Sequence, residues 1–127
     1  MSVQLNHHIV RVRDKEQAAQ FFAEILGLPP ATRYGPFLVL QTANEVSLDF
    51  ADDHGAPVPA HYAFLVSEAE FDEIFARITE RGLDYWADPS HRRPNAINTN
   101  DGGRGVYWDD PNGNSLEIIT RPYGSGG

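Results

Sequence analysis

The feature that most limits how this chain can fold is an internal repeat, in which an alternating segment is followed by a helical pattern. Residues 5–12 alternate in polarity and are rich in β-branched side chains, as expected of a strand. Residues 61–66 alternate in the same way. Each segment is followed by a helix N-cap residue, Asp14 or Ser67, and then by apolar side chains at helical spacing. We therefore expect two modules that each begin with a strand and a helix.

Both predicted helices end at a Gly-Leu pair, Gly27-Leu28 and Gly82-Leu83, and further strands follow each of them. We predict these later strands at residues 37–41, 46–50, 105–108 and 115–120. The last two are joined by Asp-Pro-Asn-Gly, a sequence typical of a tight turn. The prediction is an α+β fold of two βαβββ modules, residues 1–54 and 55–127, that form a cupped mixed sheet with the helices outside.

Composition excludes several classes of function. The chain of 127 residues contains no cysteine, which excludes disulfides and thiolate metal sites. Imidazole and carboxylate ligands remain, and they suit Fe(II), Mn(II), Ni(II), Co(II) or Zn(II). A net charge of −8 argues against nucleic-acid binding, which needs a basic surface. No long apolar segment or basic leader precedes residue 5, so we expect a cytoplasmic protein with no membrane association.

Four residues occupy matching places in the two modules. His7 and His61 begin equivalent strands, and Asp49 and Glu117 lie between apolar neighbours in the last strand of each module. A carboxylate in an apolar strand is costly unless it is paired or binds a metal. Taken singly, a strand histidine is more often structural and a strand acid more often faces solvent. The symmetry of the four positions favours a metal site with histidine nitrogen and carboxylate oxygen ligands, in which some coordination positions stay open.

Three segments resemble the vicinal-oxygen-chelate superfamily, which includes glyoxalase I, extradiol dioxygenases, fosfomycin-resistance transferases and bleomycin-resistance proteins. Residues 5–14, LNHHIVRVRD, resemble its opening strand. The sequence HYAF at residues 61–64 is similar to the strand that opens the second module, particularly in fosfomycin-resistance proteins. Residues 107–117, YWDDPNGNSLE, resemble the closing motif that ends in a ligand glutamate. The resemblance covers nearly the whole chain.

The resemblance implies a role for each candidate residue. His7, His61 and Glu117 take the places of the metal ligands. Asp49 is a candidate fourth ligand, because glyoxalase I uses four protein ligands, although aspartate is one methylene shorter than the glutamate found there. Arg11 falls where glyoxalases keep an arginine in the cavity that contacts an anionic group of the substrate. We give equal weight to the alternative that Arg11 is a surface residue on an edge strand.

The motifs do not select one member of the superfamily. The spacing from Tyr107 to Glu117 matches the extradiol-dioxygenase signature, in which this tyrosine faces substrate; a packed tyrosine is the alternative. That signature also contains a histidine within residues 98–100, where this chain has Asn-Thr-Asn, and asparagine is not an acid–base group near neutral pH. Fosfomycin transferases carry a serine- and acid-rich loop that binds a cation before the closing motif, and residues 98–103 of this chain do not resemble that loop. Bleomycin-resistance proteins usually lack the metal triad.

We favour a divalent-metal-dependent enzyme of the glyoxalase/dioxygenase type, whose small substrate chelates the metal through neighbouring oxygens. The reaction would be that of a lyase, an isomerase or an Fe(II) dioxygenase, with the metal as Lewis acid. Tyr107 and Asn98 would orient the substrate, and Arg11 would offset its charge. The alternative is a bleomycin-resistance-like protein that sequesters an antibiotic without turnover. We expect a homodimer, with the modules pairing either within one chain or across the dimer. We interpret residues 91–93, His-Arg-Arg, as a solvated loop cluster.

Overall fold

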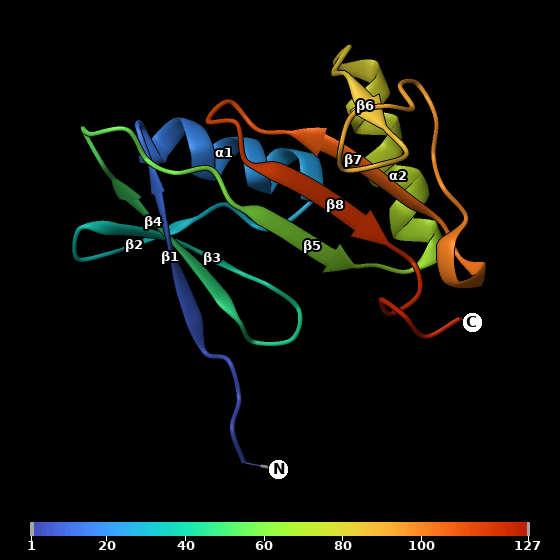
Figure 1. Cartoon of the computed structure of the whole chain (residues 1–127). Helices are drawn as coiled ribbons and strands as arrows, with labels where there is room; N and C mark the ends of the chain where they lie inside the picture. The colour runs from blue at the N-terminus through green and yellow to red at the C-terminus, as the bar shows by residue number, and fades with distance from the viewer. Residues whose placement is uncertain (1, 127) are drawn as a thin grey trace. The chain divides into compact units, whose positions relative to one another are not determined.

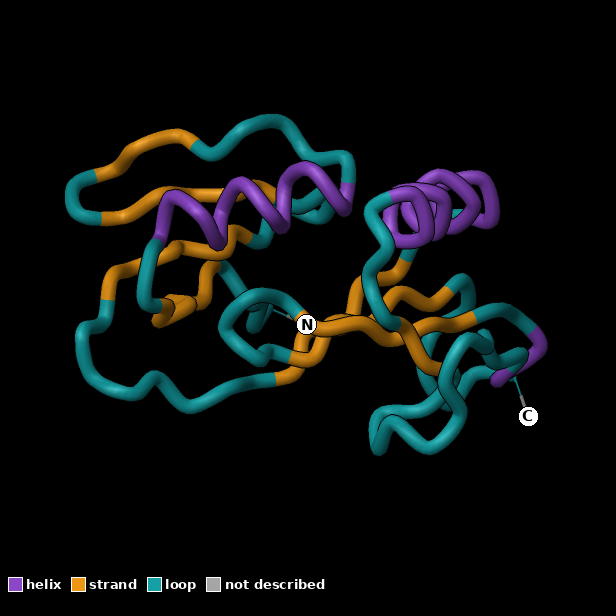
Figure 2. Tube along the Cα trace, turned by 90° about the horizontal axis from the view of Figure 1, so that it is seen from above, coloured by secondary structure: helices purple, strands orange, loops and turns teal. Residues whose placement is uncertain are grey.

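The computed structural model describes residues 2–126, which form two compact units divided between Val58 and Pro59 (Figure 1). The sheet order is β1-β4-β3-β2 in the first unit and β5-β8-β7-β6 in the second. In each unit one α-helix accompanies a mixed sheet (Figure 2). The α+β fold of two βαβββ modules is thereby confirmed. None of the helices within residues 2–126 is long and apolar enough to span a membrane.

The first unit contains β1 (His7–Val12), α1 (Lys15–Leu26), β2 (Thr32–Tyr34), β3 (Phe37–Gln41) and β4 (Ser47–Asp52). Strand β1 is parallel to β4, and β3 pairs antiparallel with both β4 and β2. The predicted strand at 46–50 begins one residue later and extends to Asp52. The sequence analysis did not delimit β2, because its three exposed residues pair only with β3 and carry no buried face.

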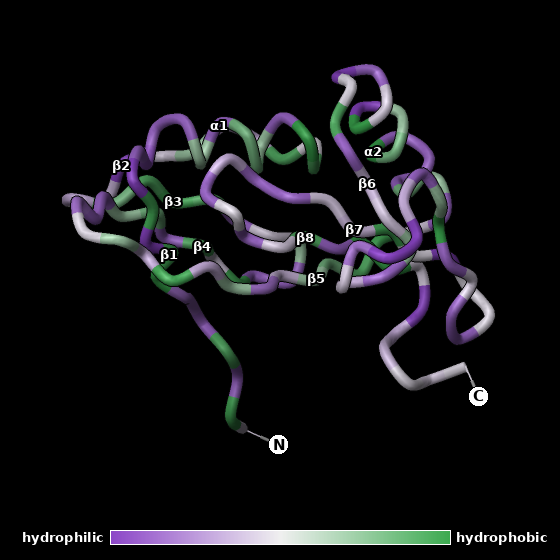
Figure 3. Tube along the Cα trace, turned by 45° about the horizontal axis from the view of Figure 1, so that its top comes forward, coloured by the Kyte–Doolittle hydropathy of each residue, from purple (hydrophilic) through white to green (hydrophobic). Residues whose placement is uncertain are grey.

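Local sequence signals define α1 at both ends. The Asp14 side chain accepts hydrogen bonds from the backbone N–H groups of Glu16 and Gln17, and Gly27 adopts the left-handed conformation with φ of 74°. The helix buries its apolar side against the sheet, where Phe22 meets Phe50 edge to face with ring centroids 4.9 Å apart. Hydrophobic and hydrophilic residues both recur along α1, as expected of a helix with one buried side (Figure 3).

The second unit contains β5 (His61–Leu65), α2 (Glu68–Glu80), β6 (Tyr85–Trp86), a short 3-10 turn (Asn100–Gly102), β7 (Gly105–Asp109) and β8 (Ser115–Ile119). The fully buried side chains of α2, Phe71 and Ile78, face the core together with Val106, Trp108 and Ile118 of the sheet. The segment between β6 and β7 is a long loop that contains the 3-10 turn and two isolated β-bridges.

The repeat extends to the backbone register of the strands. In the first unit His7 pairs with Ser47, and Ile9 with Asp49. In the second unit His61 pairs with Ser115, and Ala63 with Glu117. The two modules therefore place each histidine and each carboxylate at equivalent positions on the sheet face away from the helix-packed core.

Acidification is expected to remove a stabilising contribution of Glu70 at the start of α2. Glu70 and Ser67 form a reciprocal capping box, with distances of 2.8 Å and 3.0 Å. Hydrogen bonds from the Ser67 backbone and then its side chain hold the pKa of Glu70 below its ordinary value of 4.5. Because this folded-state pKa is depressed, the stabilisation is present above the ordinary value and is lost as pH falls through the folded one. Urea denaturation should show Glu70→Gln less stable than wild type by about 0.5 kcal/mol at neutral pH.

This difference between wild type and Glu70→Gln should shrink as pH falls below 4.5 and vanish once Glu70 is protonated in the folded state. An unchanged difference across that range would show that the charge of Glu70 does not stabilise the helix. The effect is small because the side chain is solvent-exposed and its charge is screened.

Candidate functional site

Three of the predicted site residues gather on one face of the second sheet. His61 lies on β5, Glu117 on the adjacent β8, and Tyr107 on β7, where it is the register partner of Glu117. The Nε2 atom of His61 is 3.0 Å from Oε1 of Glu117. The Tyr107 hydroxyl hydrogen-bonds the Glu117 carboxylate, and its ring stacks with that of His61 at a centroid distance of 5.9 Å. The period of two along each strand thus directs all three side chains to the same side.

The second ring nitrogen of His61 determines what Nε2 can do. Nδ1 lies 3.1 Å from the backbone oxygen of Ser115. The Ser115 hydroxyl is 3.3 Å from the same nitrogen, so Nδ1 can donate to the carbonyl or accept from the hydroxyl. When Nδ1 accepts, Nε2 donates a hydrogen bond to Glu117; when Nδ1 donates, Nε2 presents its lone pair towards the carboxylate, and a metal cation can join the two atoms. A backbone carbonyl behind the ring is the usual arrangement for a metal-ligating histidine.

Glu117 is a buried carboxylate. Its exposed fraction is 7%, and its neighbours in the chain, Leu116 and Ile118, are fully buried in the core. Such a group is costly unless it has polar partners, which His61 and Tyr107 supply. Burial first, and then the hydrogen bond to Glu117 and its charge, raise the pKa of Tyr107 far above its usual range. Tyr107 therefore keeps its proton near neutral pH and serves as a donor to Glu117.

The donor set and spacing of His61 and Glu117 fit a divalent metal. Two ligands that are each about 2.1 Å from one ion are separated by about 3.0 Å in octahedral and about 3.4 Å in tetrahedral coordination, and the two atoms here are 3.0 Å apart. His7 belongs to the first unit, where its Nδ1 is 2.7 Å from Oδ1 of Asn6. Within either unit, among residues 2–126, no three His, Asp or Glu side chains lie close enough together to hold one metal ion. The three-ligand site stays a prediction.

Asp49 in the first unit occupies the place that Glu117 has in the second. Its exposed fraction is 9%, and its Oδ1 accepts a hydrogen bond of 3.0 Å from the Ser47 hydroxyl. Arg11 is exposed and lies on β1 on the same face as His7, four residues away. The roles predicted for Asp49 as a fourth ligand and for Arg11 as a substrate-binding residue stay predictions.

Asn98 anchors the loop that precedes β7. Its buried side chain donates from Nδ2 to the Ala87 carbonyl at 2.8 Å and accepts at Oδ1 from the N–H of Asn100 at 3.2 Å. Its backbone pairs with Gly105, where an added Cβ would come within 2.8 Å of Oδ1 of Asn98. The protein thus occupies both ends of the amide. The predicted contact of Asn98 with substrate stays a prediction.

A buried network that the sequence analysis assigned only to a turn positions the start of β5. Oδ1 of Asp110 accepts from the N–H groups of Asn112 and Asn114 at 2.9 Å and 2.7 Å, and Oδ2 accepts from Nδ2 of Asn114 at 2.8 Å. Oδ1 of Asn114 accepts from the N–H of Ala60 at 2.8 Å, next to His61. No local signal could have identified this contact, because Ala60 and Asn114 are 54 residues apart.

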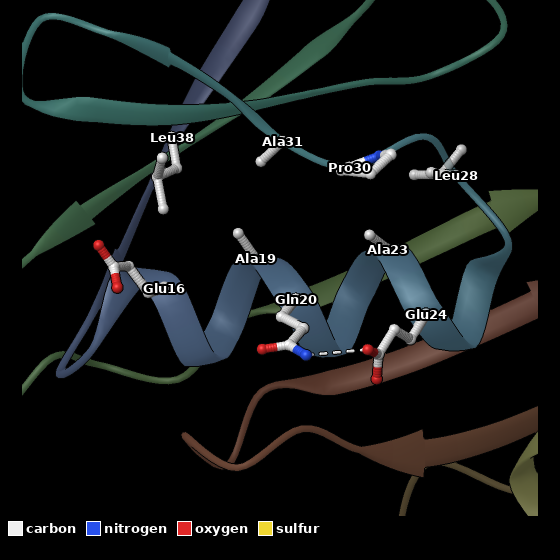
Figure 4. Close-up of a pocket in the computed structure, with 9 residues that line it drawn as sticks. All are labelled: Glu16, Ala19, Gln20, Ala23, Glu24, Leu28, Pro30, Ala31 and Leu38. Atoms are coloured by element: carbon white, nitrogen blue, oxygen red, sulfur yellow. Dashed lines mark hydrogen bonds between the residues drawn. The ribbon is translucent and has the colours of Figure 1, made fainter.

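The first unit contains a cavity of about 410 Å³ between α1 and the segment that follows it (Figure 4). Its lining is mainly apolar, with Ala19, Ala23, Leu28, Pro30, Ala31 and Leu38, and three polar side chains complete it: Glu16, Gln20 and Glu24. Gln20 donates to Glu24 at 2.9 Å. None of the predicted site residues lines this cavity.

The comparison with known families decides the assignment. The family model described as "Glyoxalase/Bleomycin resistance protein/Dioxygenase superfamily" matches residues 4–118. The chain belongs to this superfamily. The resemblance seen in the sequence is thus confirmed, and the matched segment contains His7, Asp49, His61, Tyr107 and Glu117.

Proteins whose names indicate different reactions are similar to this chain. Solved structures named "Oxidase ChaP-H1" and "Oxidase ChaP-H2" are each 63% identical, with TM-scores of 0.95 and 0.96. The alignments cover 97% of this chain and 99% of the first, and 100% of this chain and of the second. "Glutathione transferase FosA" of Serratia marcescens is 28% identical over 120 residues, 90% of this chain and 78% of its own length.

Proposed function

We propose that the protein is a divalent-metal-dependent enzyme whose small substrate binds the metal through two neighbouring oxygen atoms. The observation that carries this proposal is the His61–Glu117 pair, 3.0 Å apart, with the ring held by the Ser115 carbonyl. We assign His7 as the third ligand, and Asp49 remains the candidate fourth. The names of the 63% identical oxidases favour oxygen-dependent chemistry over isomerisation or elimination.

The bound metal would supply a Lewis acid and, if it is Fe(II), access to dioxygen chemistry. The protein's own contribution is positioning. Ser115 orients the ring of His61, and Tyr107 donates to Glu117, so that both ligands are held before an ion arrives. Ala63, the register partner of Glu117, is small and exposed, which leaves space for a substrate above the strand. Arg11 would offset negative charge on that substrate.

Metal analysis tests the proposal. Wild-type protein exposed to a mixture of divalent cations should retain about one equivalent after desalting, and His61→Ala should lose it, because one of the few nitrogen ligands is removed. The matched control is His54→Ala, which removes an exposed histidine outside the strands. Elemental analysis gives the stoichiometry and the identity of the retained metal.

Absence of stoichiometric metal from the wild type, or its retention in His61→Ala, would contradict the metal site. The antibiotic-sequestering alternative would then become the working hypothesis. It predicts that an aromatic or cationic drug binds with an affinity that a chelator does not change. Size-exclusion chromatography with light scattering on the same samples would test the proposed homodimer.

A further inference from the structure

His91 lies on the same sheet face as the proposed metal ligands. Trp86 of β6 is the register partner of Tyr107, so the two side chains share a face. Asp109 follows Tyr107 by two residues and shares that face too. His91 contacts both of these flanking side chains: its ring stacks on Trp86, and its Nε2 approaches Asp109. The strands that carry them, β6 and β7, are adjacent in the sheet (Figure 1).

The contacts of His91 orient its two nitrogens differently. The rings of His91 and Trp86 are nearly parallel, at 4°, with centroids 3.6 Å apart. Nε2 is 3.6 Å from Oδ1 of Asp109, and both side chains are 38% exposed. For Nδ1, residues 2–126 provide no hydrogen-bond partner. Nε2 faces Asp109 just beyond hydrogen-bond distance. When the neutral ring carries its proton on Nε2, Nδ1 presents an open lone pair.

The loop holds His91 in a conformation that side chains other than glycine rarely adopt. The φ angle of His91 is 60°. Neighbouring contacts impose it, since the Asp88 carboxylate accepts from the N–H groups of Arg92 and Arg93 at 2.7–3.0 Å. The N–H of Ala87 also donates to the Arg93 carbonyl at 3.0 Å. Unusual backbone that the surrounding structure over-determines is typical of functional positions.

Other groups near the site are poorly suited to accept a proton. Tyr107 is protonated and donates to Glu117, and the Asn98 amide does not titrate. The charged groups around Asp109 are His91, Asp110 of the following turn and Asp84 before β6. Burial raises the pKa of Asp109, and the two neighbouring acids add to this, while His91 opposes it. A positive charge on His91 would therefore be well placed in this cluster of carboxylates.

We propose that His91 is the general base of the site, held over β7 by Trp86 and Asp109. This inference rests on the function proposed above. A hydroxyl of the bound substrate gives its proton to Nδ1: the O–H bond breaks, an N–H bond forms, and the oxygen keeps the electron pair. The resulting imidazolium is stabilised by Asp109 and by the face of Trp86, and it later releases the proton to water. Tyr107 lies beside the proposed ligand Glu117, and Asp109 lies beside His91. These two residues of β7 are about 7 Å apart along the strand, a distance that one aromatic ring of a substrate can span.

A spectroscopic titration tests this assignment without requiring turnover. The probe is a nitrocatechol, whose absorption spectrum reports the loss of each hydroxyl proton, bound to protein loaded with redox-inert Zn²⁺. The variant is His91→Asn, because asparagine tolerates the left-handed backbone but does not accept a proton at neutral pH. We expect the bound probe to hold its second proton about tenfold more tightly in His91→Asn than in wild type. Asp109→Asn should shift it in the same direction, and His54→Asn should not.

Identical titration curves for the probe on wild type and His91→Asn would overturn the role of His91. A failure of the proposed function looks different, because the wild type would then show no zinc-dependent binding of the probe. Trp86→Phe tests the position of the loop: it keeps a ring beneath His91 that stabilises the imidazolium less well, so it should shift the curve in the same direction but less than His91→Asn does. A shift in Trp86→Phe as large as that in His91→Asn would mean that loop position, not the base, controls the probe.

Discussion

Glu117→Gln is expected to weaken metal binding by at least about 100-fold, which corresponds to about 2.7 kcal/mol. The substitution keeps the volume of the side chain and removes its charge. It also places a neutral amide where the Glu117 carboxylate now faces Nε2 of His61 and the Tyr107 hydroxyl. A buried site that has lost its anionic ligand no longer compensates the desolvation of a divalent cation. Isothermal titration of apo protein with Zn²⁺ or Mn²⁺ measures the change.

Two further variants calibrate this result. Tyr107→Phe keeps the carboxylate and loses only the hydroxyl that orients it, so we expect a smaller loss of about tenfold. Asp49→Asn distinguishes a site with three protein ligands from one with four, since only a ligating Asp49 should change the affinity. Wild-type affinity in Glu117→Gln would show that the Glu117–His61 pair is a structural hydrogen bond.

Asp110→Ala is expected to lower the free energy of unfolding by about 3 kcal/mol and to weaken metal binding as well. The 6% exposed carboxylate accepts three hydrogen bonds in the turn between β7 and β8. Its removal leaves buried donors on Asn112 and Asn114 without an acceptor, which costs more than the loss of the bonds alone. Asn114 also holds Ala60, so the backbone before His61 loses its anchor. Urea denaturation and metal titration of the same sample measure the two effects.

The matched control for Asp110→Ala is Asp72→Ala in the same unit. Asp72 is exposed and pairs with Arg104 at 2.9 Å on the surface, so its loss should cost less than about 1 kcal/mol. It should leave metal affinity unchanged. Equal destabilisation by the two substitutions would contradict the importance that we assign to the turn network.

The elements predicted correctly are those whose signal is local. The cap at Asp14, the capping box of Ser67 and Glu70 and the left-handed Gly27 each depend on residues within four positions along the chain. Strands β1 and β5 were predicted because their side chains alternate, and in the structure one face of each strand is less exposed than the other. By contrast, β2 and β6 have three and two residues, too few to show a period, and they exist because β3 and β7 offer them an edge.

The sequence by itself determined the two-module architecture and the positions of His61 and Glu117 within it. Both follow from alternation and repetition, which act over neighbouring residues. Only the tertiary structure decided that Nδ1 of His61 meets the Ser115 carbonyl and that Tyr107 donates to Glu117, since these contacts join different strands. It also placed His91, which lies in an exposed loop, against Trp86 and Asp109. Strand pairing brings residues that are distant in the chain into contact, and no pattern along the sequence records which of them will meet.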